Sequence, residues 1–287
     1  MKKIALIGVE NSHAPAFLRL IREKPEKYGD LEVVGVYSYD GEAAKKLVDG
    51  GLAPMTADHP STFLGKADGV INTARHGDFH YEYSLPYLRE GIPMFIDKPF
   101  CIAPHNAREL IETAQTAGAP VCGGSSLKFA RELLDVKARL QGGEFGELFS
   151  ASLSAPVNMT NPYGNFFFYA AHLAQMLLTL IGRPDSVRAF GRENAVTAVC
   201  RYGAYDVTLQ YVGYYYSVTV FGTKSSFHTP VTVDETLYEQ ELDEFCTMLR
   251  TGIQPVSAAE LTDPVALLDT MYLSFRTGTE QPVRPIL

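Results

Sequence analysis

Asp97, Lys98 and Pro99 directly follow the apolar run of residues 92–96. A lysine there is expected at the carboxyl end of a parallel strand, the edge at which open α/β sheets bind ligands. Pro99 fixes φ and ends the strand, so the backbone position of Lys98 is well defined. A partly desolvated ammonium has a lowered pKa and can exchange a proton with a substrate hydroxyl. A surface lysine before a turn proline is the alternative interpretation of the same residues.

The elements that would position Lys98 alternate between strand-like and helix-like patterns. Strands are expected at residues 3–9, 32–37, 69–73, 94–96 and 120–122. Helices are expected at residues 14–24, 41–48, 79–90 and 104–117. This alternation predicts βαβ units and a parallel, doubly wound sheet, which is a Rossmann arrangement in a domain of residues 1–122.

The pattern changes after Gly123 and Gly124. Helices are expected at residues 127–140, 166–181, 236–250 and 264–277. Closely spaced strands, rich in Val, Thr, Tyr and Phe, are expected at residues 148–153, 186–192, 195–202, 205–211, 214–221 and 227–233. Residues 123–287 therefore predict a second, α+β domain with a mostly antiparallel open sheet, and the fold class of the chain is α/β.

Composition excludes several classes of function. The 287 residues carry a formal net charge of -8, which argues against a nucleic-acid partner. The four cysteines are widely spaced, which predicts free thiols in a reducing compartment: Cys101, Cys122, Cys200 and Cys246. No set of residues has the spacing of metal ligands, so we expect no metal site. The apolar run 4–9 is short for a secretory core, and residues 166–181 are interrupted by polar residues. We expect a cytoplasmic protein with no membrane partner.

The turn after the first strand is where a dinucleotide's pyrophosphate would meet a helix N-terminus. The usual fingerprint is Gly-x-Gly-x-x-Gly. The six positions here are Gly8, Val9, Glu10, Asn11, Ser12 and His13. Glu10 replaces the second glycine, so its carboxylate must turn away from the phosphates or the site must bind differently. Asn11 and Ser12 can cap the helix and bond phosphate, although a turn that binds nothing would use the same residues.

The second strand ends near Ser38, where an acidic residue would hold a ribose diol. A small neutral hydroxyl tolerates a 2′-phosphate, which favours NADP, although no arginine for that phosphate is evident nearby. Asp40 is the alternative ribose ligand, but it fits better as the cap of the next helix.

Taken in order, several motifs resemble the Gfo/Idh/MocA oxidoreductase family over almost the whole chain. They are the Gly8 loop, Asn72-Thr73-Ala74 with His80, Asp97-Lys98-Pro99 for the family's Glu-Lys-Pro, Gly146-Glu147-Leu148, the His172 helix ending near Gly182-Arg183-Pro184, and Glu244-Phe245 with Ser274-Phe275. The resemblance implies NAD(P)-dependent oxidation or reduction of a sugar, polyol or related hydroxyl or keto compound. It also implies a homo-oligomer, a dimer or tetramer, formed through the C-terminal sheet.

The resemblance also implies roles for individual residues. Lys98 would touch nicotinamide and substrate hydroxyl, and His172 would move the proton, with Tyr169 as a further catalytic candidate. Substrate would meet Lys98, Asn165, Tyr169 and His172. The cofactor, NADP or NAD, would meet Gly8, Val9, Glu10, Asn11, Ser12, His13, Ser38, Thr73, Ala74, Arg75, His76, His80, Asp97, Lys98 and Pro99.

The helix around His172 departs from the family pattern. Counting from this histidine, Phe168 and Gln175 stand where the family often has aspartates. Tyr169 or Asn165 could supply a polar group instead. Together with Glu10, these departures leave an alternative function: a catalytically degenerate member of the fold that binds a nucleotide or another ligand, or a structural oligomer with a vestigial site.

Overall fold

The computed structural model describes residues 1–192 and 195–287. It contains two compact units, one of Met1–Gly124 with Glu235–Leu261 and one of Ser125–Asp234 with Thr262–Leu287. The sequence predicted a simple division after residue 122, with all later residues in the second domain. In the structure, residues 235–261 belong to the first unit. Within the described ranges, no helix combines the length and hydropathy that crossing a membrane requires.

The first unit is built on a five-stranded parallel sheet in the order β2-β1-β3-β4-β5. Its strands are β1 (Lys2–Ile7), β2 (Leu31–Tyr37), β3 (Gly69–Asn72), β4 (Met94–Asp97) and β5 (Val121–Gly124). Strands β3, β4 and β5 are buried throughout, as expected where helices cover both faces of a parallel sheet. The predicted Rossmann arrangement is confirmed.

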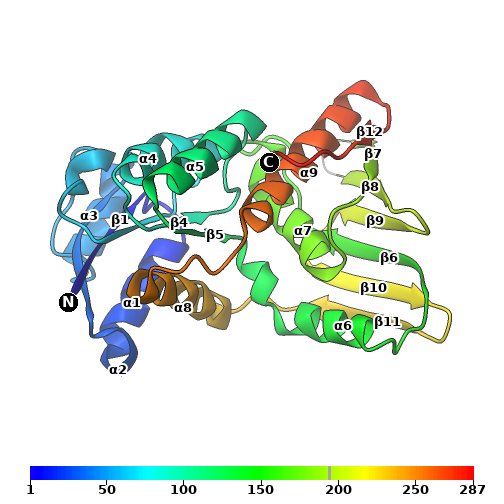
Figure 1. Cartoon of the computed structure of the whole chain (residues 1–287), viewed down its shortest axis with the longest axis horizontal. Helices are drawn as coiled ribbons and strands as arrows, with labels where there is room; N and C mark the ends of the chain where they lie inside the picture. Colours follow the sequence, from blue (N-terminus) through cyan, green and yellow to red (C-terminus); the bar gives the residue numbers. More distant parts are fainter. Residues whose placement is uncertain (193–194) are drawn as a thin grey trace. The chain divides into compact units, whose positions relative to one another are not determined.

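Helices cover this sheet on two sides. Figure 1 shows α4 (Gly77–Arg89) and α5 (Pro104–Ala117) above it, and α1 (His13–Glu23) and α8 (Glu235–Thr251) below it. The remaining helices of the unit are α2 (Pro25–Tyr28), α3 (Gly41–Asp49) and a 3-10 turn, Pro60–Phe63. Neither α2 nor the 3-10 turn was expected from the sequence, and each is a single turn long.

Helix α8 packs tightly against the sheet although it lies far along the chain. Its Leu242 and Phe245 share a buried core with Phe17 of α1 and Ile4 of β1. A Cβ on Gly69 would lie 2.8 Å from Leu249 Cδ1, so the absence of a side chain at Gly69 lets α8 approach β3 closely. Burying apolar side chains of this size stabilises each by roughly 2–3 kcal/mol, which explains why α8 joins this unit.

All five strands run in the same direction, so their carboxyl ends meet at one edge. The chain leaves β1 towards β2 on one side and later returns to β3 on the other. Such a reversal of strand order creates the crevice at which doubly wound sheets bind ligands. The loops after β1, β2, β3 and β4 supply the residues described below.

The second unit contains a seven-stranded sheet, in its described part, with the order β11-β10-β6-β9-β8-β7-β12. Its strands are β6 (Leu148–Ala155), β7 (Ser186–Arg192), β8 (Ala195–Arg201), β9 (Asp206–Tyr211), β10 (Tyr216–Gly222), β11 (Ser226–Val231) and β12 (Gln281–Pro282). Pairing is antiparallel except between β6 and β9. The expected mostly antiparallel sheet is confirmed.

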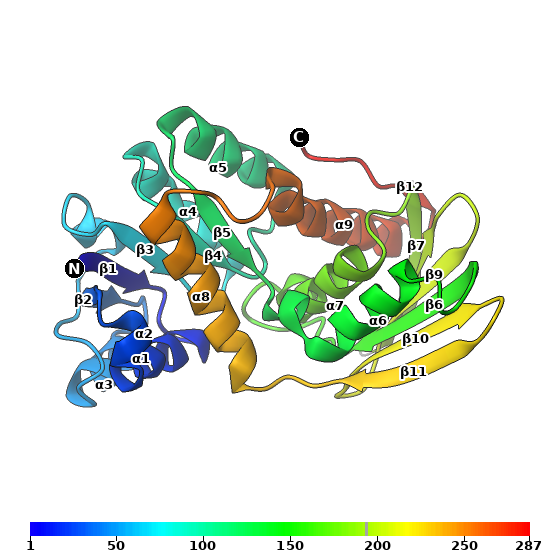
Figure 2. The same cartoon turned by 60° about the horizontal axis from the view of Figure 1, so that its bottom comes forward.

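One face of this sheet is buried by helices. Along β6, Leu153 is buried while Ser152 and Ser154 on the opposite face are partly exposed, which is the period of two expected for a half-covered strand. Figure 2 shows α6 (Arg131–Gln141) and α7 (Phe166–Leu180) along the covered face. Tyr272 of α9 (Ala258–Thr277) packs against Phe166, its ring centroid 6.0 Å away.

The helix expected at residues 127–140 is divided in the structure. A 3-10 turn, Ser126–Phe129, precedes α6, and Ala130 between them has an extended backbone with ψ of 123°. Ser125 caps the 3-10 turn, its hydroxyl accepting from Leu127 N–H at 3.3 Å. A serine cap and one extended residue are local features that the apolar spacing alone does not reveal.

Candidate functional site

Lys98 follows β4 and is only 8% exposed. Its backbone N–H donates to Asp97 Oδ1 at 2.7 Å, which fixes the direction in which the lysine leaves the strand. Burial lowers the pKa of Lys98, while the charges of Asp97 and Glu241 raise it and that of Arg75 lowers it. Lys98 is therefore a desolvated amine in the field of two carboxylates.

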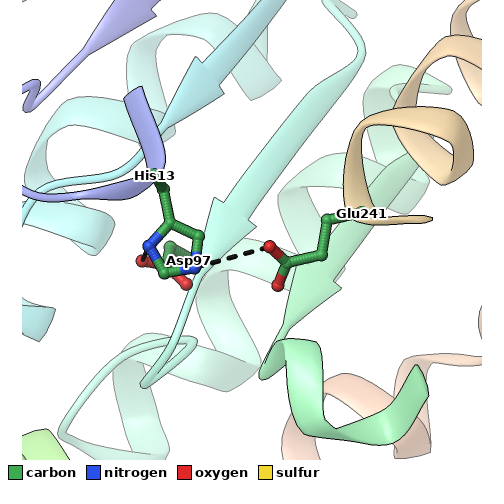
Figure 3. Close-up of side chains that lie close together, drawn as sticks. All are labelled: His13, Asp97 and Glu241. Carbon is green, nitrogen blue, oxygen red and sulfur yellow. Dashed lines mark ion pairs between the residues drawn. The ribbon is translucent and has the colours of Figure 1, made fainter. Parts of the chain in front are cut away.

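His13, Asp97 and Glu241 form a buried cluster beside this lysine (Figure 3). They come from the start of α1, the end of β4 and the middle of α8. His13 Nδ1 lies 3.5 Å from Asp97 Oδ2, and His13 Nε2 lies 3.4 Å from Glu241 Oε2. His13 is 6% exposed and Glu241 is 1% exposed.

The imidazole of His13 has a carboxylate oxygen near each of its two ring nitrogens. A neutral imidazole carries a hydrogen on one ring nitrogen only, yet here each nitrogen faces a carboxylate oxygen. Burial lowers the pKa of His13, and the charge of Asp97 opposes that shift. In the neutral ring, one of the two nitrogens therefore turns a lone pair towards a carboxylate oxygen, which is an unfavourable contact.

A histidine and two carboxylates are also ligands that a divalent cation accepts. Their ligand atoms lie within 4.8 Å of one another. Lys98, however, lies in the field of both Asp97 and Glu241, so an ammonium already offsets their charge. The sequence expectation of no metal site rested on ligand spacing, which cannot detect residues this far apart in the chain. We keep that expectation as a prediction on the ground of the competing ammonium.

Glu10 extends across the carboxyl edge from the loop after β1. Its Oε2 accepts a hydrogen bond from Ser38 Oγ at 2.8 Å, and its Oε1 accepts one from Arg75 N–H at 2.9 Å. The carboxylate therefore bridges the ends of β2 and β3. Of the two alternatives that the sequence left open, the structure shows the one in which Glu10 turns away from the N-terminus of α1.

Asn11 caps the N-terminus of α1. Its Oδ1 accepts from His13 N–H at 2.9 Å and from Ala14 N–H at 3.3 Å, and its Nδ2 donates to the Thr73 carbonyl. The predicted cap is thus Asn11. Ser12 occupies the position before the helix without a side-chain cap bond, and its hydroxyl lies 3.2 Å from the Tyr238 hydroxyl.

Gly8 is required by the tight turn that follows β1. Its φ is +69°, and a Cβ there would lie 2.4 Å from Ala74 N and Cα. Thr73 Oγ1 donates to the Gly8 carbonyl at 3.1 Å and ties the two loops together. This turn, a helix N-terminus beside it and polar groups at the ends of β2 and β3 fit a dinucleotide, provided that the Glu10 carboxylate stays at Ser38.

The other expected cofactor residues after β3 have structural roles in the loop and helix that follow. His76 caps α4, its Nδ1 accepting from Asp78 N–H at 3.3 Å. His80 is fully buried, its Nδ1 lies 2.6 Å from the Pro99 carbonyl, and burial lowers its pKa. His80 thus holds the turn that carries Lys98 in place.

Asp40, which follows β2, caps α3 by accepting from Glu42 N–H at 3.2 Å. This is the role that the sequence favoured for it.

His172 lies on α7 in the second unit. Its Nδ1 is 2.8 Å from Ser125 Oγ, and its ring contacts Tyr216 edge-on with centroids 5.8 Å apart. Tyr169 precedes it by three residues and therefore shares its face of the helix. Asn165 stands immediately before α7 with a φ of 54°.

Sequence reasoning missed two residues of these sites, Ser125 and Glu241. Ser125 supplies the hydroxyl beside the His172 ring. Gln175, which replaces the family aspartate, donates instead to Thr179 Oγ1 at 3.4 Å. The signal for Ser125 was available, because a hydroxyl directly after the fifth predicted strand is a candidate by position. Glu241 had no such signal, since an acidic residue in an amphipathic helix is usually solvated.

Comparison with known proteins identifies the class to which the first unit belongs. The Gfo/Idh/MocA model, described as an oxidoreductase family with an NAD-binding Rossmann fold, matches residues 2–124. The predicted resemblance to this family is confirmed, and it rests on the N-terminal part of the chain. Residues 2–124 are thus similar to the NAD-binding Rossmann fold of this oxidoreductase family.

Two Escherichia coli (strain K12) proteins are similar to part of the chain. Uncharacterized oxidoreductase YhhX is 29% identical over 141 residues, covering 44% of this chain and 41% of its own length. D-glucoside 3-dehydrogenase is 27% identical over 127 residues, covering 44% and 36%. The match thus spans well under half the length of either relative.

Solved structures extend the similarity of fold to the whole chain. Myo-inositol 2-dehydrogenase from Lactobacillus plantarum has a TM-score of 0.85 at 13% identity, covering 99% of both chains. Scyllo-inositol dehydrogenase from Lactobacillus casei, solved with NAD(H) and scyllo-inositol, has a TM-score of 0.83 at 13% identity, with the same coverage. At such identities the comparison establishes the fold alone.

Proposed function

We propose that this protein is an NAD(P)-dependent oxidoreductase that transfers hydride between a nicotinamide cofactor and a hydroxyl or keto group of a sugar, polyol or related small molecule. The observation that carries the proposal is the buried Lys98 at the carboxyl end of β4, beside two carboxylates, in a Rossmann unit of an oxidoreductase family. The sugar and inositol dehydrogenases among the similar proteins support the substrate class.

The bound cofactor would supply the hydride chemistry, and the chain would supply binding and proton transfer. Gly8, Asn11 and the N-terminus of α1 would hold the pyrophosphate, with Ser38 and Glu10 near the adenosine ribose. Lys98 would hydrogen-bond the substrate oxygen through Nζ and polarise it. Its desolvated ammonium is suited to this role, because hydrogen bonds from charged donors are the stronger ones.

His172 would move the proton at the substrate oxygen. Ser125 Oγ, 2.8 Å from Nδ1, would hold the imidazole ring in a fixed orientation. Tyr169, on the same helical face, would contact substrate together with Asn165. The family aspartate absent at Gln175 is thus replaced, in this proposal, by the hydroxyl of Ser125.

His13, Asp97 and Glu241 would keep Lys98 in its charged form. Burial alone favours the neutral amine, and the two carboxylates oppose it. His13 would lie between the two carboxylates and keep them apart.

A second function, a nucleotide- or ligand-binding protein without redox activity, is favoured by one observation. The Glu10 carboxylate and the Asn11 amide already bond the groups that a cofactor would meet. A small-molecule ligand, a homo-oligomer formed through the second unit's sheet and a cytoplasmic location are parts of both proposals.

Calorimetric titration with NADH and NADPH, followed by a panel of polyols, inositols and keto sugars, tests the choice. The chain has no tryptophan, so energy-transfer fluorescence is a poor probe. Binding followed by measurable hydride transfer would support the oxidoreductase. Binding without turnover on the whole panel would favour the second function, and no binding by folded protein would contradict the first.

A further inference from the structure

We propose that Glu10 replaces the acidic residue that usually follows β2, and that it makes this unit select NAD(H) over NADP(H). The inference rests on the proposed function, because it assumes that a dinucleotide binds at the carboxyl edge. It departs from the sequence expectation that Ser38 favours NADP.

The position of the Glu10 carboxylate carries the inference. In Rossmann units that use NAD, an acidic side chain after β2 accepts hydrogen bonds from the ribose hydroxyls. Here β2 ends at Tyr37 and the next residue is Ser38, which offers no carboxylate. Glu10 reaches that strand end from the loop after β1 and lies 2.8 Å from Ser38 Oγ. Glu10 thus places a carboxylate at the end of β2, where residue 38 itself does not supply one.

The hydroxyl of Ser38 already makes two hydrogen bonds within the protein. Its hydroxyl hydrogen is donated to Glu10 Oε2, and its oxygen accepts from Asp40 N–H at 3.1 Å. The side chain is only 6% exposed. Ser38 therefore cannot donate to a 2′-phosphate while Glu10 keeps its present position, so the hydroxyl does not favour NADP.

Glu10 is held in this position from a second side. Arg75 N–H donates to Oε1 at 2.9 Å, so each carboxylate oxygen has one fixed donor. A carboxylate oxygen can accept two hydrogen bonds, which leaves capacity on both oxygens for the two hydroxyls of a ribose diol. A 2′-phosphate carries no hydrogen to donate when ionised and would be repelled by the carboxylate.

The experiment is titration of NADH and NADPH, by calorimetry and by thermal shift, into the wild-type protein and the variants Glu10→Gln, Glu10→Asp and Glu23→Gln. Glu10→Gln keeps the shape and removes the charge, and Glu10→Asp keeps the charge. Glu23 lies exposed at the end of α1, so Glu23→Gln is a matched control for the loss of one charge.

We expect the wild-type protein to bind NADH at least about tenfold more tightly than NADPH, a preference of the size that one charge contact provides. Glu10→Gln should reduce that preference about tenfold, mainly by strengthening NADPH binding. Glu10→Asp and Glu23→Gln should retain it. Unfolding temperatures measured without cofactor will show that each variant is folded.

The contrary outcomes separate this inference from the proposed function. Equal affinity of the wild-type protein for both cofactors, or a preference that Glu10→Gln leaves unchanged, would overturn the role of Glu10 alone. Failure of both cofactors to bind the wild-type protein and every variant would overturn the proposed function as well. Binding that appears only in Glu10→Gln would mean that Glu10 occludes the site, which also contradicts selection.

Discussion

Glu241 Oε2 lies 3.4 Å from His13 Nε2, and this contact joins the middle of α8 to the first residue of α1. Both side chains are buried, and His13 also faces Asp97 through its other ring nitrogen. A helix from the late part of the chain therefore completes the charge balance at the end of β4. The relationship gives α8 a chemical role besides its apolar packing.

Replacing Glu241 should reduce the fraction of Lys98 that is charged and able to polarise the substrate oxygen. Burial lowers the pKa of Lys98, and the charges of Asp97 and Glu241 oppose this. Glu241→Gln removes one opposing charge, so the pKa of Lys98 should fall further and the ammonium should be lost at lower pH. In the direction of ketone reduction, the basic limb of the kcat/KM profile should move to lower pH.

Glu235→Gln is the control for this experiment, because Glu235 lies on the same helix and is exposed. Its pH profile should match that of the wild-type protein. Superimposable profiles for Glu241→Gln and the wild-type protein would show that Glu241 does not influence the charge of Lys98.

His13 should make the protein sensitive to acid. Burial lowers the pKa of His13 in the folded state, whereas the unfolded chain has the ordinary value of 6.5. Between these two values the unfolded state binds more protons, so the free energy of unfolding falls as pH drops through 6.5 towards the folded pKa. Urea unfolding at several pH values should show this slope, and His13→Asn should reduce it.

Part of the slope should remain in that variant, because burial also lowers the pKa of His80. The exposed His105 offers the control His105→Asn, which should leave the slope intact. Identical slopes in the wild-type protein and His13→Asn would rule out a buried, neutral His13.

Gly8→Ala should destabilise the first unit more than Gly118→Ala does. Both glycines have a φ of +69°, but a Cβ meets Ala74 atoms at 2.4 Å in the first case and nothing within 4 Å in the second. We expect a loss of about 1–2 kcal/mol for Gly118→Ala from the left-handed backbone alone. Gly8→Ala should lose about 1–3 kcal/mol more, because the added methyl overpacks the turn. Equal losses in chemical unfolding would contradict the close approach of the two loops.

The polar face of the second unit's sheet should form the interface of a homo-oligomer. Ser152 stands in register between Thr219 of β10 and Thr208 of β9, on the face opposite the buried Leu153. Light scattering after size exclusion should give a dimer or tetramer. Ser152→Arg should shift it towards monomer, since symmetry places like charges together, and Thr116→Arg on exposed α5 should not. A monomeric wild-type protein would contradict this interface.

Local signals in the sequence were sufficient for the fold and for part of the site. The strand–helix alternation predicted the parallel sheet, and the residue types at Asn11 and Asp40 predicted two caps that the structure contains. The proline after Lys98 located the end of β4 within one residue. These features depend on neighbouring residues, so spacing and residue type reveal them.

Tertiary features of the site could not be predicted. Glu241 resembles a solvated residue of an amphipathic helix until α8 is placed against β4. The direction of the Glu10 side chain depends on two donors, Ser38 Oγ and Arg75 N–H, that come from different loops. The sequence could state the alternatives at Glu10, but only the positions of β2 and β3 decide between them.

The most direct test of the proposed function is hydride transfer by Lys98→Met, followed as NADH absorbance in single turnovers with the best polyol or keto substrate. Lys98→Arg, which keeps the charge, and the second unit's Lys128→Met serve as controls. We predict that Lys98→Met still binds the cofactor while its rate falls by about 10²–10³, the loss usual when a donor that polarises the reacting oxygen is removed. Full turnover by Lys98→Met would contradict the account.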